Sequence, residues 1–312
     1  MSACSRDRPN ANEYEYDAMT NRCSREHRAV GKKNMTIIVE NTSRFVDAGG
    51  VKIHYHEAGN GPVLVCIHGG APGAFGWGNF GRNLEALSAH FRTIIVDLPG
   101  YGKSDKPTID GSRDNFYAET FVLMLDALGI DKAHILGMAT GGGVAIHMAL
   151  AHPERINRLV LLSCPGGLQL FTLLPAQLGS QGYYADDGPS IKKMRAYLEG
   201  MLYNKALLTD DVVRERYEAS IDPDFMANPP EGNGGPRRKM DPLWQDLHRI
   251  QAPTLVMWGR DNRTVGYDAA LFMLNQIPDV RVQIFGQCGL WIPFEKMAEF
   301  NYSVIGFLSL PT

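Results

Sequence analysis

The chain has 312 residues, 44% of them hydrophobic and 21% charged, which is ordinary for a globular protein with one large α/β domain or two smaller ones. Its formal net charge of −3 argues against a nucleic-acid partner or an anionic membrane surface, and no apolar run reaches the roughly 18 residues that span a bilayer. The five cysteines are scattered without metal-ligand spacing, so we expect reduced thiols, no metal and a cytoplasmic protein.

The first 34 residues differ in texture from the rest of the chain. They are rich in Arg, Glu, Asn and Ser, show no hydrophobic periodicity and contain no apolar stretch that could serve as a secretory signal. Residues 1–34 are therefore predicted to form a disordered tail, with translation starting at Met1 or at Met35, just before the patterned sequence.

Strand and helix signals then alternate in chain order. Two strands around the Gly49-Gly50 turn predict a hairpin, and short apolar runs predict buried strands further on. The strands are expected at 43–46, 51–57, 63–67, 93–96, 133–136, 158–162, 254–258 and 280–285, with helices near 83–89, 116–128 and 295–308 and another between the last two strands. This pattern predicts a mostly parallel eight-stranded sheet flanked by helices, with a core of residues 35–164 and 251–312. Residues 165–250 show only helical patches, which predicts a helical lid over the carboxyl ends of the strands.

One turn in this pattern has the layout of a nucleophile elbow. The sequence Gly137-Met138-Ala139-Thr140-Gly141 follows a buried strand directly and opens an amphipathic helix. In such an elbow a strained turn between two glycines raises one side chain above the sheet. The raised position is Ala139, which has no hydroxyl and cannot act as a nucleophile.

Several further motifs accompany the elbow. They are HGGAPGA at 68–74 with Trp77 and Asn79, DLPGYG at 97–102, RYEAS at 216–220, WGRDNR at 258–263 and FGQCGLW at 285–291. Together they resemble the α/β-hydrolase fold and, within it, the meta-cleavage product hydrolases, which cleave carbon–carbon bonds in vinylogous diketone acids. The resemblance extends from Ser43 to Leu308.

The resemblance implies a catalytic triad of Ser, Asp and His in that chain order, and none of the three is present. The serine position falls on Ala139, the acid position on Asn262 and the histidine position on Leu290. Met138 stands where the family tends to carry an Asn. Because triad members act as a unit, one loss suffices to stop turnover, so several losses together indicate divergence rather than a single engineered replacement.

Neighbouring residues are not expected to replace the triad. Asp261 is one residue from the acid position, but a shift of one residue on a loop re-aims the side chain. Thr140 has no base supplied by the sequence, and Cys288 occurs in the family beside an intact triad. His147 and His152 are expected on the outer or packing side of the elbow helix. No other Ser, His and Asp stand where the fold is expected to bring them together.

The groups that would bind an acidic substrate are retained. The resemblance implies an oxyanion hole built from the backbone N–H groups of Thr140 and of Gly70 or its neighbour, which side-chain replacement does not remove. It also places substrate contacts on Asn79, Arg216 and Trp291, with Met138 beside them. A planar guanidinium suits a carboxylate or enolate. A surface arginine at 216 and plain core packing of Trp291 are the alternatives.

Three functions follow as hypotheses. The first, which the sequence favours, is a non-hydrolytic enzyme that needs no cofactor and performs a tautomerisation, cyclisation or lyase-type step on a small keto-acid or polyketide-like carbonyl compound. The second is a ligand-binding or partner-supporting pseudoenzyme. The third is a meta-cleavage-product-type hydrolase with a displaced triad, or an inactivated variant of one. The expected ligand is a small carboxylate or diketone-like molecule, and the family's habit of oligomerising makes a homo-oligomer an expectation.

Overall fold

The computed structural model describes residues 39–168, 182–230 and 241–311. The predicted N-terminal tail and both candidate start residues lie outside these ranges, as do parts of the predicted lid. Residues 37–312 belong to one compact unit.

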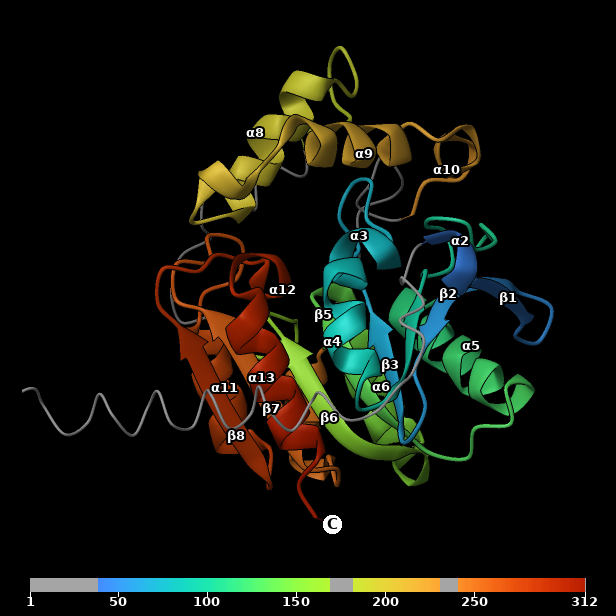
Figure 1. The fold of residues 1–312 in the computed structure, drawn as a ribbon, viewed down its shortest axis with the longest axis vertical. Coiled ribbons are helices and arrows are strands. Elements are labelled where there is room, and N and C mark those ends of the chain that lie inside the picture. Colours follow the sequence, from blue (N-terminus) through green and yellow to red (C-terminus); the bar gives the residue numbers. More distant parts are fainter. Residues whose placement is uncertain (1–38, 169–181, 231–240, 312) are drawn as a thin grey trace, which may run out of the picture. The chain divides into compact units, whose positions relative to one another are not determined.

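A single eight-stranded sheet forms the centre of this unit, in the spatial order β1-β2-β4-β3-β5-β6-β7-β8 (Figure 1). The pairs β1–β2 and β2–β4 are antiparallel, and every neighbouring pair from β4 to β8 is parallel. This confirms the predicted hairpin and the mostly parallel sheet. The strands are β1 (Ser43–Asp47), β2 (Lys52–Ala58), β3 (Val63–Ile67), β4 (Arg92–Val96), β5 (Ala133–Met138), β6 (Ile156–Leu162), β7 (Thr254–Gly259) and β8 (Val280–Phe285).

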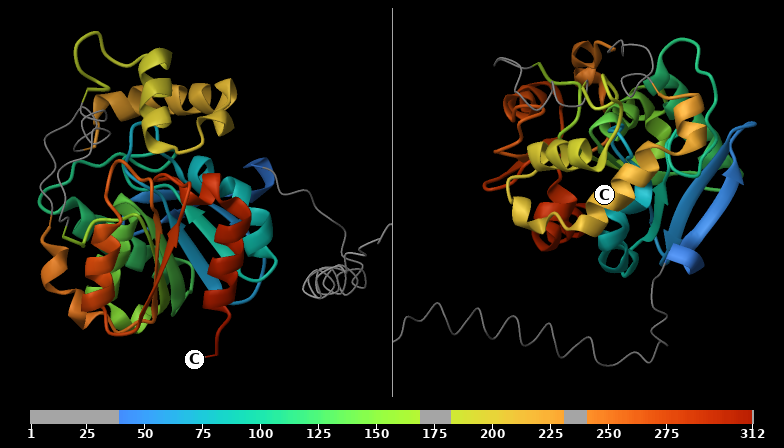
Figure 2. Two further views of the ribbon diagram at one scale, coloured as in Figure 1. Left: turned by 90° about the vertical axis from the view of Figure 1, so that its left-hand side faces the viewer. Right: turned by 90° about the horizontal axis from the view of Figure 1, so that it is seen from above.

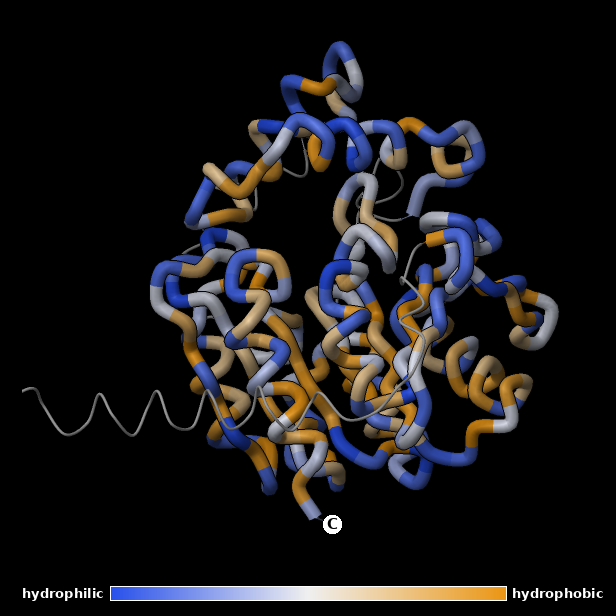
Figure 3. Tube along the Cα trace, viewed as in Figure 1, coloured by the Kyte–Doolittle hydropathy of each residue, from blue (hydrophilic) through white to orange (hydrophobic). Residues whose placement is uncertain are grey.

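Two hydrophobic cores hold the sheet, one on each face. Successive residues of the central strands alternate between them: Val65 packs into one core and Cys66 into the other. Because both faces are covered, the central strands consist of nearly continuous apolar residues. Figure 3 shows these hydrophobic positions along the strands, whereas the hydrophilic positions lie largely on helices and loops.

Helices cover both faces of the sheet (Figures 1 and 2). One core is built with α5 (Arg113–Ala127), α6 (Thr140–Ala151) and α11 (Asp268–Gln276). The other is built with α3 (Gly76–Phe80), α4 (Leu84–Ser88) and α13 (Met297–Leu308). The short elements are α2 (Val39–Thr42), η1 (Gly81–Asn83), η2 (Pro153–Arg155) and α12 (Ile292–Glu295). Among the described helices, none is long and apolar enough to cross a membrane.

A group of helices stands above the carboxyl ends of the strands, between β6 and β7 in the chain (Figure 1). It contains α8 (Ile191–Met201), η3 (Lys205–Leu207), α9 (Asp210–Ser220) and α10 (Pro223–Ala227), and η4 (Leu243–Gln245) and η5 (Leu247–Arg249) lead back to the sheet. Side-chain caps fix where the longer helices begin: the Ser190 hydroxyl accepts from the N–H of Lys193, and the Thr209 hydroxyl accepts from that of Val212. These helices cover the edge of the sheet at which the elbow lies.

Candidate functional site

The elbow is present, and it joins β5 to α6 at Ala139. This residue adopts φ 47° and ψ −116°, a conformation that costs a non-glycine residue about 1–3 kcal/mol. A Cβ on Gly137 would lie 2.2 Å from the Gly141 carbonyl oxygen, and one on Gly141 would lie 2.3 Å from that of Ile67. Both flanking glycines are therefore required by close backbone approach. The turn at Ala139 is therefore strained, and the side chain that it raises is a single methyl group.

The loop after β3 packs directly against this turn. His68 accepts the N–H of Leu98 at Nε2 (3.0 Å) and donates from Nδ1 to the Gly69 carbonyl (2.7 Å), which fixes a neutral imidazole. Burial lowers the pKa of His68 to about 4. The Tyr101 hydroxyl donates to the Gly70 carbonyl (3.0 Å), and a Cβ on Gly70 would meet the Thr140 hydroxyl at 2.6 Å. Gly70 and Thr140, the two residues expected to supply oxyanion donors, are thus neighbours.

The residues at the predicted acid and histidine positions, Asn262 and Leu290, do not form a proton relay. Asn262 is buried, and its Oδ1 accepts from the N–H groups of Thr264 (2.8 Å) and Val265 (3.2 Å). Its Nδ2 is buried and has no hydrogen-bond partner among the described residues. Leu290 is buried in the apolar core and has hydrogen-bonding groups only in its backbone: its N–H donates to the Met201 carbonyl (2.8 Å), and its carbonyl accepts from Ile292 (3.2 Å). The Asn262 side chain therefore holds its own loop, and the Leu290 side chain has no proton to pass.

The neighbouring polar residues make contacts of their own. Asp261 pairs with Arg260 at 3.3 Å, and burial raises the pKa of the Cys288 thiol to about 12, which leaves it a poor nucleophile. His147 lies 3.1 Å from Asp241, and His152 lies 2.9 Å from the carboxylate of Glu119. Within the described ranges, no group of three or more His, Cys, Asp or Glu side chains is placed to hold a metal ion.

Arg216, on α9, is buried rather than a surface residue of the lid. It is 2% exposed, and neither its Nε nor its Nη1 has a hydrogen-bond partner in the described part of the chain. Its guanidinium lies over the ring of Trp291 at 5.5 Å, and the buried indole Nε1 of Trp291 also lacks a described partner. Desolvation lowers the pKa of Arg216, while nearby tyrosines, with Tyr197 first, act in the opposite direction. The structure brings together two buried donors with unmet hydrogen-bonding capacity.

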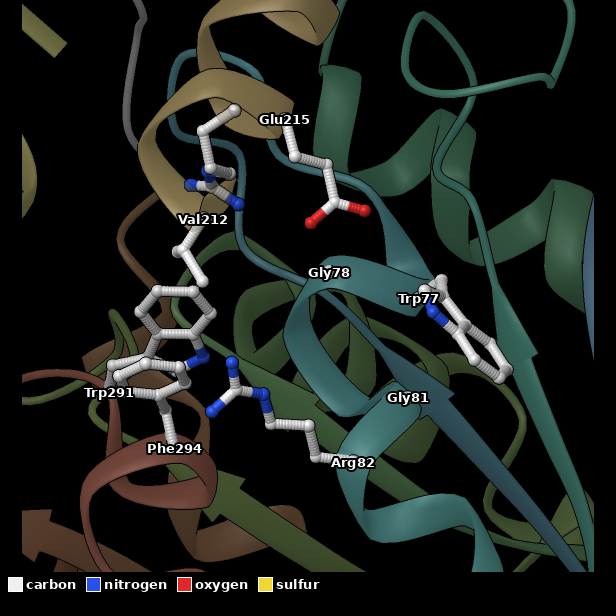
Figure 4. Close-up of a pocket in the computed structure, with 9 residues that line it drawn as sticks. Trp77, Gly78, Gly81, Arg82, Val212, Glu215, Trp291 and Phe294 are labelled. Carbon is white, nitrogen blue, oxygen red and sulfur yellow. The ribbon is translucent and has the colours of Figure 1, made fainter. Parts of the chain in front are cut away.

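A cavity of about 190 Å³ opens beside these donors (Figure 4). Trp291 and Phe294 form one wall as a stacked pair, with ring centroids 4.5 Å apart and planes inclined by 18°. The lining residues are Trp77, Gly78, Gly81, Arg82, Val212, Glu215, Arg216, Trp291 and Phe294. Asn79 is buried on α3, and its side-chain amide donates to the Phe75 carbonyl (3.1 Å). Met138 lies in the adjoining apolar core with Leu290. The sequence did not single out Arg82, Glu215 or Phe294, because these residues come from distant segments that only the folded chain brings together.

The structure corrects one expectation, because it contains a hydrogen-bonded Ser–His–Asp set away from the elbow. His54 Nδ1 donates to Asp97 Oδ2 at 2.8 Å, and its Nε2 forms a hydrogen bond with the Ser43 hydroxyl, also at 2.8 Å. Burial works to raise the pKa of Asp97, but hydrogen bonds, led by that from His54, bring it below its usual value. These residues belong to β1, β2 and the end of β4, and no sequence spacing announces their meeting.

This set cannot work with the oxyanion donors at the elbow. In the sheet, β1 lies four strand positions away from β5, which corresponds to about 19 Å. Asp97 also accepts the N–H groups of Gly76 (2.7 Å) and Lys103 (3.0 Å). These bonds tie the start of α3 and the loop after β4 to the sheet, which is a structural task.

Comparison with known proteins agrees with this architecture. The α/β hydrolase fold family matches residues 62–297, so the chain belongs to the α/β-hydrolase family. Proteins of similar sequence indicate a subgroup within this family. A protein of Burkholderia vietnamiensis named 2-hydroxy-6-oxononadienedioate/2-hydroxy-6-oxononatrienedioate hydrolase is 35% identical over 277 residues, which cover 86% of this chain and 96% of that protein. A Comamonas testosteroni protein named 2-hydroxy-6-oxo-6-phenylhexa-2,4-dienoate hydrolase is 36% identical over 287 residues, which cover 88% and 99%.

A solved structure of the same group also superposes on the chain. It is a serine-to-alanine mutant of the meta-cleavage product hydrolase from Pseudomonas fluorescens IP01, complexed with acetates. The TM-score is 0.76 at 32% sequence identity, and the match covers 85% of this chain and 96% of that one. The predicted resemblance to meta-cleavage product hydrolases is confirmed.

Proposed function

We propose that this chain is a meta-cleavage-product-type α/β hydrolase that recognises a small, acidic, diketone-like ligand, and that cleavage through the elbow position has been lost. The observation that carries the proposal is the buried Arg216, whose Nε and Nη1 lack partners among the described residues. A buried N–H without an acceptor costs about 1–3 kcal/mol, so such an arrangement is expected where a ligand supplies the acceptor. A carboxylate or enolate suits the guanidinium, because its oxygens match the planar fork of donors.

The names of the relatives support the same ligand class. They are hydrolases of 2-hydroxy-6-oxo dienoates and dienedioates, and one relative holds acetates in a serine-to-alanine form. This favours the third hypothesis, a carbon–carbon hydrolase type with a displaced triad or an inactivated variant of one, over the non-hydrolytic enzyme that the sequence alone favoured. The chain is then expected to keep the ligand chemistry of these hydrolases.

The proposed loss of cleavage rests on three side chains. If Ala139, Asn262 and Leu290 stand at the triad positions, there is no hydroxyl to attack, no imidazole to accept its proton and no carboxylate to orient an imidazole. The Ser43–His54–Asp97 set is the only Ser–His–Asp chain of hydrogen bonds seen in the described ranges, and its serine lies on β1, four strand positions or about 19 Å from β5 and the elbow. We therefore favour the inactivated variant over the displaced triad.

A non-hydrolytic step is the second candidate, and one observation favours it. Gly70 lies against Thr140, the residue after Ala139, so we expect their backbone N–H groups on one side of a carbonyl placed above the elbow. Preorganised donors of this kind stabilise a developing oxyanion without covalent chemistry. Turning a dienol into its keto form moves a proton from the enol oxygen to carbon, so solvent water would take the first proton and return one to carbon, while such donors stabilise the dienolate in between.

The test uses 2-hydroxy-6-oxo-6-phenylhexa-2,4-dienoate, the compound in the name of one relative. Its conjugated chromophore reports binding, tautomerisation and cleavage through different absorbance changes, and chromatography identifies the products. We expect binding without formation of benzoate. Arg216→Gln should weaken binding at least about tenfold, the low end for a charge-assisted hydrogen bond.

The other outcomes separate the candidates. A new tautomer without benzoate would establish the non-hydrolytic enzyme. Benzoate formation that disappears in Ser43→Ala would establish a displaced triad and overturn the proposed loss of cleavage. Absence of binding, or binding that ignores Arg216→Gln, would overturn the proposed ligand site.

A further inference from the structure

We propose that Arg82 forms a second acid-binding subsite, so that the preferred ligand is a dicarboxylate with one acidic group at Arg216 and the other at Arg82. The inference rests on the proposed function, because it extends the same ligand site. Both arginines line one cavity, although they come from segments more than a hundred residues apart, η1 and α9.

The two guanidinium groups stand at the two ends of an aromatic pair. Arg82 lies 4.4 Å above the ring of Phe294, Phe294 stacks on Trp291, and Arg216 lies 5.5 Å from the Trp291 ring. Figure 4 shows Arg82 reaching from the side of Gly81 toward these rings. A cation–π contact positions the guanidinium without using its N–H groups as hydrogen-bond donors. The Arg82 N–H groups can therefore still bind a ligand.

The residues that line the cavity differ in solvent exposure, from a buried floor to an exposed rim. Arg216 and Trp291 are each 2% exposed, whereas Arg82 and Glu215 are exposed. A ligand with one acid group on the floor and a second at its other end would therefore place the second group among the rim residues. The apolar faces of Trp291 and Phe294 would contact the carbon chain between the two groups.

The negative charge of Glu215 would repel a second carboxylate, and the groups around Glu215 weaken this repulsion. Desolvation raises the pKa of Glu215; Arg216 and Arg82 act to lower it, and Glu218 acts to raise it. Figure 4 shows the Glu215 carboxylate apart from the Arg82 guanidinium, and the attraction between the two groups, which lowers the pKa of Glu215, leaves the guanidinium open to a ligand. A dianionic ligand would favour the protonated form of Glu215 further, which removes the repulsion through proton uptake.

The experiment compares adipate with hexanoate, which has the same number of carbons and one carboxylate. Binding of each to the full chain is measured by calorimetry at one ionic strength, for the wild type, Arg82→Gln, Arg82→Lys and Arg216→Gln. Arg249→Gln, an exposed arginine outside this cavity, is the control for net charge.

We expect the wild type to prefer adipate at least tenfold, and Arg82→Gln to weaken adipate at least tenfold but hexanoate less than threefold. Arg82→Lys should keep part of the preference, and Arg216→Gln should weaken both acids. If Arg82→Gln weakens both acids equally, or neither, while Arg216→Gln weakens both, the second subsite is wrong and the proposed function stands. If Arg216→Gln weakens neither acid, the proposed function fails and the second subsite fails with it.

Discussion

Replacing Arg216 with methionine should make the protein more stable while weakening its binding of acids. The arginine is 2% exposed, and its Nε and Nη1 have no partner among the described residues. Methionine has a similar length and no polar group to bury. If Arg216 is retained for binding, this replacement should raise the free energy of unfolding. If it is retained for packing, the replacement should lower the free energy of unfolding.

The structure sets the size of the effect. Each buried N–H position without an acceptor costs about 1–3 kcal/mol, so removing two returns about 2–6 kcal/mol. Loss of the cation–π contact with Trp291 takes back about 1–2 kcal/mol. The net expectation is a gain centred on about 2.5 kcal/mol in the free energy of unfolding, within limits of about 0 and 5 kcal/mol, and each kcal/mol raises the Tm of a domain this large by about 2–4 °C.

Urea unfolding and calorimetry measure this change, and Arg158→Met is the matched control. Arg158 is also buried and its Nε also lacks a described partner, but its Nη2 donates to the carbonyls of Leu310 (3.1 Å) and Pro311 (2.9 Å). Its replacement should lower stability, because those two acceptors lose their donor. The reasoning is refuted if Arg216→Met lowers stability as Arg158→Met does, or if it leaves acid binding unchanged.

Three further predictions follow from the same structure. Glu215→Gln should tighten binding of adipate and reduce the strengthening that falling pH gives the wild type, as titrations at two pH values would reveal. Gly73→Ala should destabilise the protein more than Gly111→Ala: both glycines have positive φ, but a Cβ on Gly73 would lie 2.0 Å from the Arg216 carbonyl oxygen, whereas one on Gly111 meets nothing within 4 Å. Burial lowers the pKa of His134 to about 4, below its ordinary 6.5, so the stability it contributes is complete above about pH 6.5 and is lost as pH falls toward 4. His134→Gln should therefore flatten the acid side of the stability profile.

Each of these three has an outcome that contradicts it. Equal affinities of the wild type and Glu215→Gln for adipate would remove Glu215 from the ligand site. Equal losses of stability in the two glycine variants would mean that strain alone, without the contact to α9, explains Gly73. An unchanged acid slope in His134→Gln would mean that this imidazole titrates alike in the folded and unfolded chains.

The fold could be predicted largely from the sequence, because its signals are local. Buried parallel strands are continuous apolar runs, and the predicted strand at 63–67 coincides with β3 (Val63–Ile67). The helix α3 (Gly76–Phe80) escaped prediction, because a five-residue segment with two glycines has neither the length nor the periodicity of a helix signal.

The site could be predicted only in part. The elbow at Ala139 was predictable, since two glycines at fixed spacing after a strand report a strained turn. The Ser43–His54–Asp97 set was not, because a strand order that interleaves β2, β4 and β3 brings these residues together. The wall of Arg82 and Phe294 was missed for the same reason, since contacts between distant segments leave no periodic trace. Asn262 shows a further limit, because only the structure reveals which atom holds the loop and which is left without a partner.

The most direct test of the central claim is a comparison of carbon–carbon cleavage by the wild type and by a variant with Ala139→Ser, Asn262→Asp and Leu290→His combined. Both are incubated with 2-hydroxy-6-oxo-6-phenylhexa-2,4-dienoate, and benzoate is quantified over a single turnover. The account predicts no benzoate from the wild type, which still binds the ligand, and benzoate from the triple variant. Cleavage by the wild type at the rate of the triple variant would contradict it.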